Sequence, residues 1–158
     1  MSNAFCCTLQ LKKMTMNKTF LSLLFSIILL SCSKSNINDS SCKFLLNVGV
    51  NTTINMSLPQ YSNLLFPSNS VYEQNVGNGG IIIINSGSGF LAWDASDPNH
   101  TQSSCSILTA NGFIATCNCE DENAYSLADG QPMNNSNLRC GLKNYRVEQS
   151  GNSLLIFN

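Results

Sequence analysis

Apolar and polar residues alternate with a period of two along much of this chain, as they do in half-buried β-strands. The clearest stretch covers residues 47–58 and ends at Pro59. One face of this predicted strand carries Val48, Val50, Thr52, Ile54, Met56 and Leu58. The next segment, "QYSNLLFPSNS", is predicted to be a connection whose apolar residues close one end of the core.

Short apolar runs then follow between turns rich in glycine and asparagine. The run "IIII", residues 81–84, is flanked by "GNGG" and "NSGSG" and predicts a strand buried on both faces. The next run, "FLAWD", predicts a strand that places Trp93 in the core. The segment "SILTANGFIATC" predicts a hairpin with Asn111-Gly112 in a type I′ turn.

The chain ends on another predicted hairpin, "LKNYRVEQSGNSLLIFN", whose turn is "SGN". Tyr145 and Val147 are expected to face inward there, across from Leu154 and Ile156. No segment shows convincing helical periodicity. The pattern therefore predicts an all-β antiparallel domain of roughly eight to ten short strands over residues 45–158.

The first third of the chain has a different pattern. Lysines precede "FLSLLFSIILL", residues 20–30, which is typical of a signal peptide over residues 1–31. Residues 1–13 are unusual ahead of such a segment, and Met14 or Met16 would give a more usual start. The ending "LLSC" resembles the lipobox of bacterial lipoproteins, which makes Cys32 the expected lipidation site. Residues 32–44 would be the lipidated, flexible tether.

Charge is sparse and excludes one class of partner. Only 11% of residues are charged and the formal net charge is −1. Five Lys or Arg and nine acids follow Cys32, so that part carries a formal net charge of −4. Without a Lys/Arg-rich run, the sequence gives no sign of nucleic-acid binding.

Five cysteines follow Cys32, and export would place them in an oxidising compartment where thiols pair. They are Cys42, Cys105, Cys117, Cys119 and Cys140. An odd number leaves at least one unpaired or metal-bound, unless pairing is intermolecular. Cys42 and Cys140 would form a disulfide if the start of the domain meets the segment before the last hairpin, with Cys117 then the free thiol.

The order of parts over residues 76–158 resembles that of a Rieske domain. A strand leads to the loop "DPNHTQSSC", and a hairpin leads to "CNCEDENAYSLADGQPM". The turn "DGQP" and the hairpin "LKNYRVEQSGNSLLI" then follow, as similar segments do in that family. Rieske-like lipoproteins of flavobacteria are similar as well. The resemblance implies a Rieske-like antiparallel β-sandwich with two cluster-type loops.

The resemblance also implies positions for the ligands of a [2Fe–2S] cluster, which two cysteines and two histidines normally hold. The first-loop cysteine falls at Asp97 and the first-loop histidine at Asn99 or His100. The second-loop cysteine falls at Cys117 and the second-loop histidine at Glu120. His100 is the only histidine in the chain, which excludes the ordinary ligand set. We therefore expect no cofactor and no metal, with a [2Fe–2S] cluster on unusual ligands as the alternative.

Some Rieske proteins carry a disulfide between the two cluster loops. The resemblance implies Cys105–Cys119 for this pair, with Cys105–Cys117 less favoured. The chain-entropy model gives roughly 3 kcal/mol of stabilisation for a loop of this length.

Two metal-binding alternatives remain open. His100 with Cys105, Cys117 and Cys119 is a candidate Cys₃His site for zinc or iron–sulfur. The acidic "EDE", residues 120–122, with Asp94 and Asp97 would make a calcium site if the two loops meet. No catalytic residues are predicted, because no nucleophile-elbow sequence and no phosphate-binding glycine loop is present.

The predicted function is that of an envelope lipoprotein whose Rieske-like domain has lost its cluster and serves as a binding or structural module. The alternatives are a Rieske-type electron-transfer protein and a zinc- or calcium-binding module. The expected partners are the membrane, through the lipid anchor, and an unidentified protein or small molecule. Ser33 after the lipidated cysteine favours the outer membrane, on its periplasmic or surface face.

Overall fold

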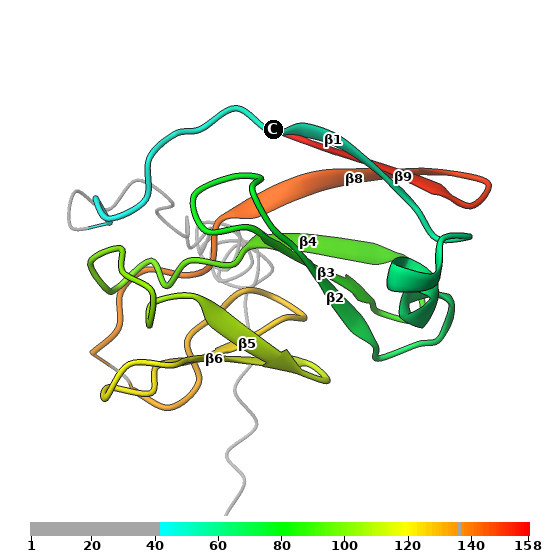
Figure 1. Cartoon of the computed structure of the whole chain (residues 1–158). Helices are drawn as coiled ribbons and strands as arrows, with labels where there is room; N and C mark the ends of the chain where they lie inside the picture. The colour runs from blue at the N-terminus through cyan, green and yellow to red at the C-terminus, as the bar shows by residue number, and fades with distance from the viewer. Residues whose placement is uncertain (1–41, 136) are drawn as a thin grey trace, which may run out of the picture. The chain divides into compact units, whose positions relative to one another are not determined.

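The computed structural model describes residues 42–135 and 137–158, which cover the predicted domain (Figure 1). The predicted signal peptide, Cys32 and most of the tether lie outside the described residues. Within them the fold is all-β and antiparallel with one short 3₁₀ helix, so the predicted fold class is confirmed. The same residues contain no helix long and apolar enough to cross a membrane.

The described strands are short, and connections of two to seven residues join most consecutive elements. In chain order the elements are β1 Asn51–Asn55, η1 Pro59–Leu65, β2 Ser70–Glu73, β3 Ile81–Asn85, β4 Phe90–Asp94, β5 Leu108–Asn111, β6 Ile114–Cys117, β7 Ala124–Ser126, β8 Asn144–Ser150 and β9 Ser153–Phe157.

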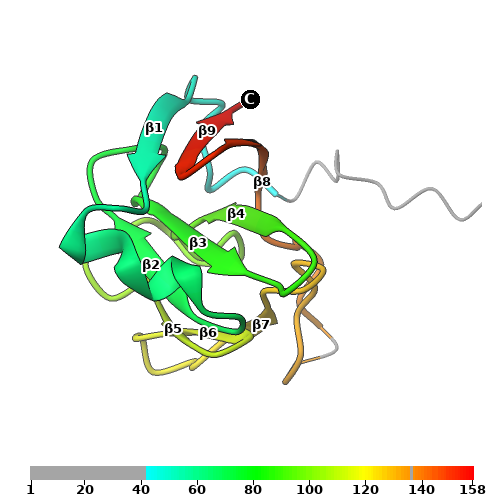
Figure 2. The same ribbon diagram turned by 90° about the vertical axis from the view of Figure 1, so that its right-hand side faces the viewer.

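The strands form two antiparallel sheets. The larger sheet has the order β1-β9-β8-β4-β3-β2, so the first and last strands of the domain pair at one edge. The smaller sheet has the order β5-β6-β7 and is inserted in the chain between β4 and β8. Figure 2 shows β5, β6 and β7 together, on the far side of β3 and β4 from β1 and β9.

The strand β3 separates the two halves of the core. Ile82 and Ile84 belong to a cluster with Trp93, Leu108 and Tyr125, against the smaller sheet. Ile81 and Ile83 belong to the other cluster, with apolar residues of β1 and β9. All four isoleucines are at most 1% exposed, which confirms that "IIII" is buried on both faces.

Trp93 joins the larger sheet to the segment after β7. It is buried, as predicted, and its indole N–H donates to the carbonyl of Leu127 at 2.9 Å. Gly130 packs on its ring: a Cβ there would lie 2.5 Å from Cζ3 of Trp93, and φ of Gly130 is +74°. The turn "DGQP" therefore needs glycine both for space and for its backbone conformation.

The first predicted strand is shorter than its alternating pattern. Its strand partner is β9, whose five residues pair only with Asn51–Asn55. Ile54 and Met56 are buried as expected, whereas Leu58 at the end of the pattern is exposed.

The predicted connection after Pro59 contains the 3₁₀ helix, which the sequence pattern missed. Pro59 suits the first position of a helix because its missing N–H is not needed there. Leu64 is fully buried and closes the core, but Leu65 and Phe66 are exposed. Of the three apolar residues Leu64, Leu65 and Phe66, only Leu64 therefore closes the core as predicted.

Two details of the predicted hairpins are wrong. Asn111 pairs with Ile114, so the turn residues are Gly112 and Phe113, and only Gly112 has positive φ. A type I′ turn needs positive φ at both positions, so this turn follows the type II′ pattern instead. In the last hairpin Val147 pairs with Ile156 as predicted, but Tyr145 pairs with Ala92 of β4.

Candidate functional site: two loops joined by a disulfide

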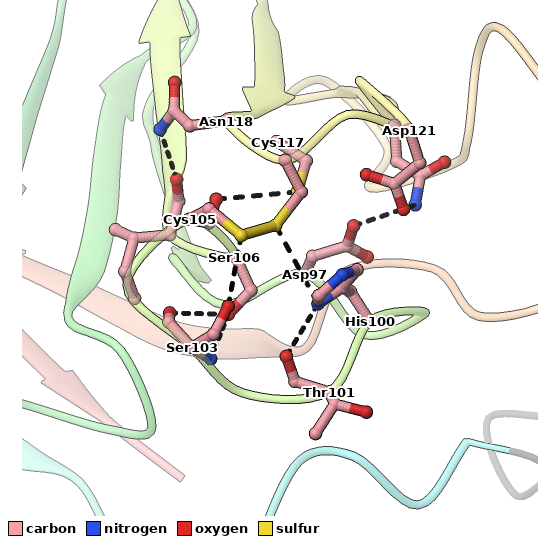
Figure 3. The surroundings of a disulfide bond; sticks show 12 residues. Asp97, His100, Thr101, Ser103, Cys105, Ser106, Cys117, Asn118 and Asp121 are labelled. Carbon is pink, nitrogen blue, oxygen red and sulfur yellow. Dashed lines mark hydrogen bonds between the residues drawn. A yellow bond between two sulfur atoms is a disulfide. The ribbon is translucent and has the colours of Figure 1, made fainter.

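Two loops, residues 95–107 after β4 and 118–123 after β6, meet beside the smaller sheet (Figure 3). The β5–β6 hairpin brings them together, because Leu108 pairs with Cys117 and the residues outside that pair are carried along. The amide of Asn118 donates to the carbonyl of Cys105 at 3.0 Å. The pairing continues beyond the strands in this way and places Cys105 beside Cys119.

Both predicted disulfides are present in the structure. Cys105–Cys119 joins the two loops, with 4.9 Å between the Cα atoms. Cys42–Cys140 joins the start of the domain to the segment before β8. Cys117 carries a free thiol and is buried.

Asp97, at the predicted first ligand position, is fully buried and holds the two loops together by hydrogen bonds. Its Oδ1 accepts from the hydroxyl of Tyr125 and, at 2.8 Å, from the backbone N–H of Asn99. Its Oδ2 accepts from the side-chain amide of Asn123 at 2.9 Å. Burial and the bond to Asp97 raise the pKa of Tyr125 far above its usual range, so the tyrosine stays a donor.

Asn99, the next ligand position, is committed to structural contacts as well. Its side-chain N–H₂ donates to the hydroxyl of Tyr125 at 2.9 Å and to the carbonyl of Cys140 at 2.7 Å. Its Oδ1 accepts from the backbone N–H of Cys140 at 3.1 Å. Asn99 thus ties the first loop to the segment that carries the Cys42–Cys140 disulfide.

Cys117 lies in a pocket that favours the neutral thiol. Its side chain is 2% exposed and its Sγ lies 3.6 Å from the carbonyl oxygen of Cys105. Burial raises the pKa of this thiol to about 11, and the negative charges of Asp97 and Asp121 act in the same direction. A thiol of this kind is a poor nucleophile at neutral pH.

His100 lies between the disulfide and the backbone of its own loop (Figure 3). Its Nδ1 is 2.6 Å from the carbonyl oxygen of Thr101 and 3.9 Å from Sγ of Cys119. The backbone N–H of His100 lies 3.4 Å from the carbonyl oxygen of Asp97. His100 is half-buried.

The predicted calcium site is not assembled. Asp94 is fully buried but binds elsewhere: it accepts from Tyr145 and from Asn78 in the turn before β3. Glu120 is exposed, and Asp121 bonds to Asn123. Within residues 42–135 and 137–158, three potential metal ligands come close together in two places, and both of these groups contain cysteine. The carboxylates by themselves therefore make no cation site there.

The residues at the ligand positions do not fit a [2Fe–2S] cluster of the Rieske type. Such a cluster needs two thiolates and two imidazoles. Asp97 and Asn99 have their polar atoms engaged by Tyr125, Asn123 and the backbone of Cys140. Glu120 is exposed in the second loop, and carboxylates are weak partners for a sulfide-bridged iron pair. We derive no chemistry through a cluster here.

Sequence reasoning missed Tyr125 and Asn123, the main partners of Asp97. Neither residue was singled out among the candidate site residues. Nothing in the sequence marks a loop aspartate as fully buried. The available signal was the alternation in "NAYSL", residues 123–127, which predicts Asn123, Tyr125 and Leu127 on the same inward face, and all three are buried.

Comparisons with known proteins give partial similarities. The ferredoxin of carbazole 1,9a-dioxygenase from Nocardioides aromaticivorans IC177 aligns with 69% of this chain and 96% of its own, at 14% identity and a TM-score of 0.44. A ferredoxin–oxygenase complex of carbazole 1,9a-dioxygenase gives 17% identity over 70% of this chain and 91% of that chain, with a TM-score of 0.45. A protein assigned as the small subunit of NADH-dependent nitrite reductase from Mycobacterium tuberculosis is 18% identical. The alignment covers 71% of this chain and 97% of that chain, with a TM-score of 0.43.

Protein-family models give no match to this sequence, and neither do curated proteins. All three structural similarities have TM-scores below 0.5.

Proposed function

We propose that residues 45–158 form a Rieske-like domain that holds no [2Fe–2S] cluster and acts as a binding or structural module of a lipid-anchored envelope protein. The observation that carries this proposal is the network around Asp97. A fully buried carboxylate accepts from Tyr125, Asn99 and Asn123 at the position where a cluster-bearing loop would present a thiolate.

The polar atoms of the Asp97 network find all their partners within the protein. We therefore infer that structural residues have replaced the cluster ligands, rather than that a set of ligands is waiting for a cluster. Throughout the described residues, no buried side-chain nitrogen or oxygen lacks a hydrogen-bond partner. A site built for a metal presents donor atoms that lack protein partners until the metal binds. Here the polar atoms of the first loop already bind the second loop and the segment before β8.

Metal and sulfide analysis tests the proposal. The full chain, purified from an exported preparation, is analysed for iron and acid-labile sulfide, and its visible spectrum is recorded. We expect iron and sulfide at background level and no visible band. Two irons and two sulfides per chain would overturn the proposal, and Cys117→Ser would then be expected to abolish the band.

The rival function is an electron carrier that holds a [2Fe–2S] cluster through unusual ligands. The measurement of iron and acid-labile sulfide decides between the two functions. For an electron carrier, Asp97→Asn would change the cluster spectrum or remove it. For the module proposed here, Asp97→Asn changes stability and has no spectrum to change.

The proposed anchor is tested separately. A labelled fatty acid is supplied to cells that express the full chain, and the protein is followed in membrane and soluble fractions. We expect Cys32→Ala to remove the label and to release the protein from the membrane fraction. Cys7→Ala is the matched control and keeps both; loss of label from Cys7→Ala instead would place the anchor elsewhere.

A further inference from the structure

Two overlapping groups of side chains that can bind metal ions lie where the two loops meet (Figure 3). The ligand atoms of His100, Cys105 and Cys119 all lie within 4.8 Å of one another. Cys119 also belongs to a second group, in which its Sγ, the Sγ of Cys117 and a carboxylate oxygen of Asp121 all lie within 4.8 Å of one another. Cys117 is not part of the first group, so its Sγ has to move toward His100 and Cys105 to complete a four-ligand site. Cys105 and His100 come from the first loop, and Cys117 and Cys119 from the second.

These separations approach those of a zinc site. Zinc–sulfur bonds of ~2.3 Å and zinc–nitrogen bonds of ~2.0 Å in a tetrahedron place ligand sulfurs ~3.8 Å apart, and sulfur and nitrogen ~3.5 Å apart. Nδ1 of His100 already lies 3.9 Å from Sγ of Cys119. The hydroxyl of Ser103 lies 3.2 Å from Sγ of Cys105, where it can donate a hydrogen bond to a metal-bound thiolate and orient it.

In the oxidised protein two of the three sulfurs are bonded to each other and cannot bind a cation as thiolates. Reduction frees them and breaks one of the links between the loops. Other contacts link the same segments: the amide of Asn118 donates to the carbonyl of Cys105, that of Asp97 to the carbonyl of Ser106, and Asp97 accepts from Asn123. These contacts do not involve the sulfur atoms and would keep the donor atoms close together, although less firmly than in the oxidised protein.

We propose that, when the Cys105–Cys119 disulfide is reduced, Cys105, Cys117, Cys119 and His100 form a tetrahedral zinc site. A dithiol supplies the two electrons: it becomes a disulfide, and the protein disulfide becomes two thiols. Zinc then displaces the three thiol protons, and a ring nitrogen of His100 gives up its contact with Thr101 to bind the metal. The inference goes beyond the proposed function, because an oxidised domain without a cluster has no need of it.

The first test is zinc stoichiometry as a function of redox state. The full chain carries Cys6→Ser, Cys7→Ser and Cys32→Ser, so that zinc bound by the first 41 residues is not counted. One sample is kept oxidised; the other is reduced with a phosphine, which takes its oxygen from water. We expect about one zinc per reduced chain in competition with a chromophoric chelator, and at least 100-fold weaker binding by the oxidised chain. Equal binding by both samples would overturn the proposal.

Ligand variants assign the site. Cys119→Ser and Cys105→Ser are expected to weaken zinc binding by the reduced chain at least 100-fold, and Cys117→Ser and His100→Gln at least 10-fold. The matched control is Cys42→Ser with Cys140→Ser, which removes the other disulfide and should leave the stoichiometry unchanged. Full-strength binding by Cys117→Ser or His100→Gln would refute the four-ligand site.

Cobalt gives a readout that folding defects do not imitate. Co²⁺ added to the reduced chain should give sulfur-to-cobalt charge-transfer absorption and the intense visible bands of tetrahedral coordination. Far-ultraviolet circular dichroism on each variant shows whether it is folded. A folded wild-type reduced chain with only the weak bands of octahedral cobalt would overturn the proposal. Iron and sulfide in the protein as purified would contradict the proposed function, but that is a different measurement on the oxidised chain.

Discussion

Asp94 and Asp97 lie three residues apart, both are fully buried, and each accepts a hydrogen bond from a tyrosine hydroxyl and an asparagine amide. Their surroundings differ. Asp94 ends a strand of the larger sheet, and its other donors include the backbone N–H groups of Asn78 and Ser96. Asp97 lies in a loop between the two sheets, beside the free thiol of Cys117 and the disulfide-bonded loops.

The comparison shows the same polar chemistry used for two purposes. Around Asp94 it fixes a turn onto a sheet that strand pairing already holds on both sides. Around Asp97 it replaces strand pairing, because the two loops share few backbone hydrogen bonds. Both disulfides are connected to the Asp97 side. Cys105–Cys119 joins its two loops, and Asn99 of the first loop accepts a hydrogen bond from the backbone N–H of Cys140. We expect the Asp97 region to depend on covalent links and the Asp94 region to be insensitive to them.

The largest effect should come from the disulfides. Cys42→Ser with Cys140→Ser opens a link across 98 residues and should lower the free energy of unfolding by about 4–5 kcal/mol. Cys105→Ser with Cys119→Ser opens a link across 14 residues and should cost about 3 kcal/mol. Urea unfolding of the full chain measures both.

Hydrogen exchange on the second of these variants locates the loss. The amide of Asn118, bonded to Cys105, should exchange faster, whereas amides of β3 should keep their protection relative to global unfolding. Equal loss of protection in β3 and in the two loops would show that the regions do not differ as proposed.

The second effect is specific to the Asp97 side, where Cys117 is the titrating group. Its thiol should titrate at about 11 in the folded protein and near its ordinary pKa of 9 in urea. Between these values the unfolded chain holds fewer protons, so the free energy of unfolding falls as pH rises, by at most about 2.7 kcal/mol. The stabilisation is fully present below pH 9. Thiolate absorbance against pH, in a chain that carries Cys6→Ser, Cys7→Ser and Cys32→Ser, measures both titrations.

Cys117→Ala is the reference for this titration, because it removes the thiol and leaves the disulfides intact. The alanine variant should lose the absorbance step and the decline in stability that begins at pH 9. A folded-state titration near the ordinary thiol value would mean that burial and the charges of Asp97 and Asp121 do not act on Cys117.

Tyrosine substitutions compare the two networks directly. Tyr125→Phe and Tyr145→Phe each remove one hydrogen bond to a buried carboxylate and should each lower the free energy of unfolding by about 2 kcal/mol. Urea unfolding near neutral pH measures the two costs. Tyr72→Phe, which removes a bond from an exposed hydroxyl to the carbonyl of Gly79, is the control and should cost less than either. A cost for Tyr125→Phe no greater than that of the control would mean that Asp97 does not need this donor.

The smallest effect concerns the backbone. In the connection before β3 the positive φ values fall on Asn75 at +62°, Gly77 at +72° and Gly80 at +93°, which are residue types that tolerate them, whereas the second loop holds Glu122 at +44°. Glu122→Gly should therefore raise the free energy of unfolding by up to about 1 kcal/mol. Glu122→Ala removes the same charge but keeps the strained conformation. If alanine stabilises as much as glycine, the gain comes from charge and not from the backbone.

Local pattern determined much of this domain. Four isoleucines between glycine-rich turns predict a strand buried on both faces. Two apolar runs on either side of the turn "SGN" predict the last hairpin. The count of cysteines, and the single histidine, decided without any structure that an ordinary Rieske ligand set is absent. These conclusions depend on residue type and on spacing of a few positions, which the sequence states directly.

The tertiary structure decided what each polar group near the cysteines does. Asp97 and Asp94 belong to one short segment, yet the first closes two loops and the second fixes a turn, so no calcium site forms. Tyr125 became the partner of Asp97 because the smaller sheet carries it across 28 residues of chain. Burial and hydrogen-bond partners arise from contacts between distant segments, and the pattern along a strand indicates only the face on which a residue lies.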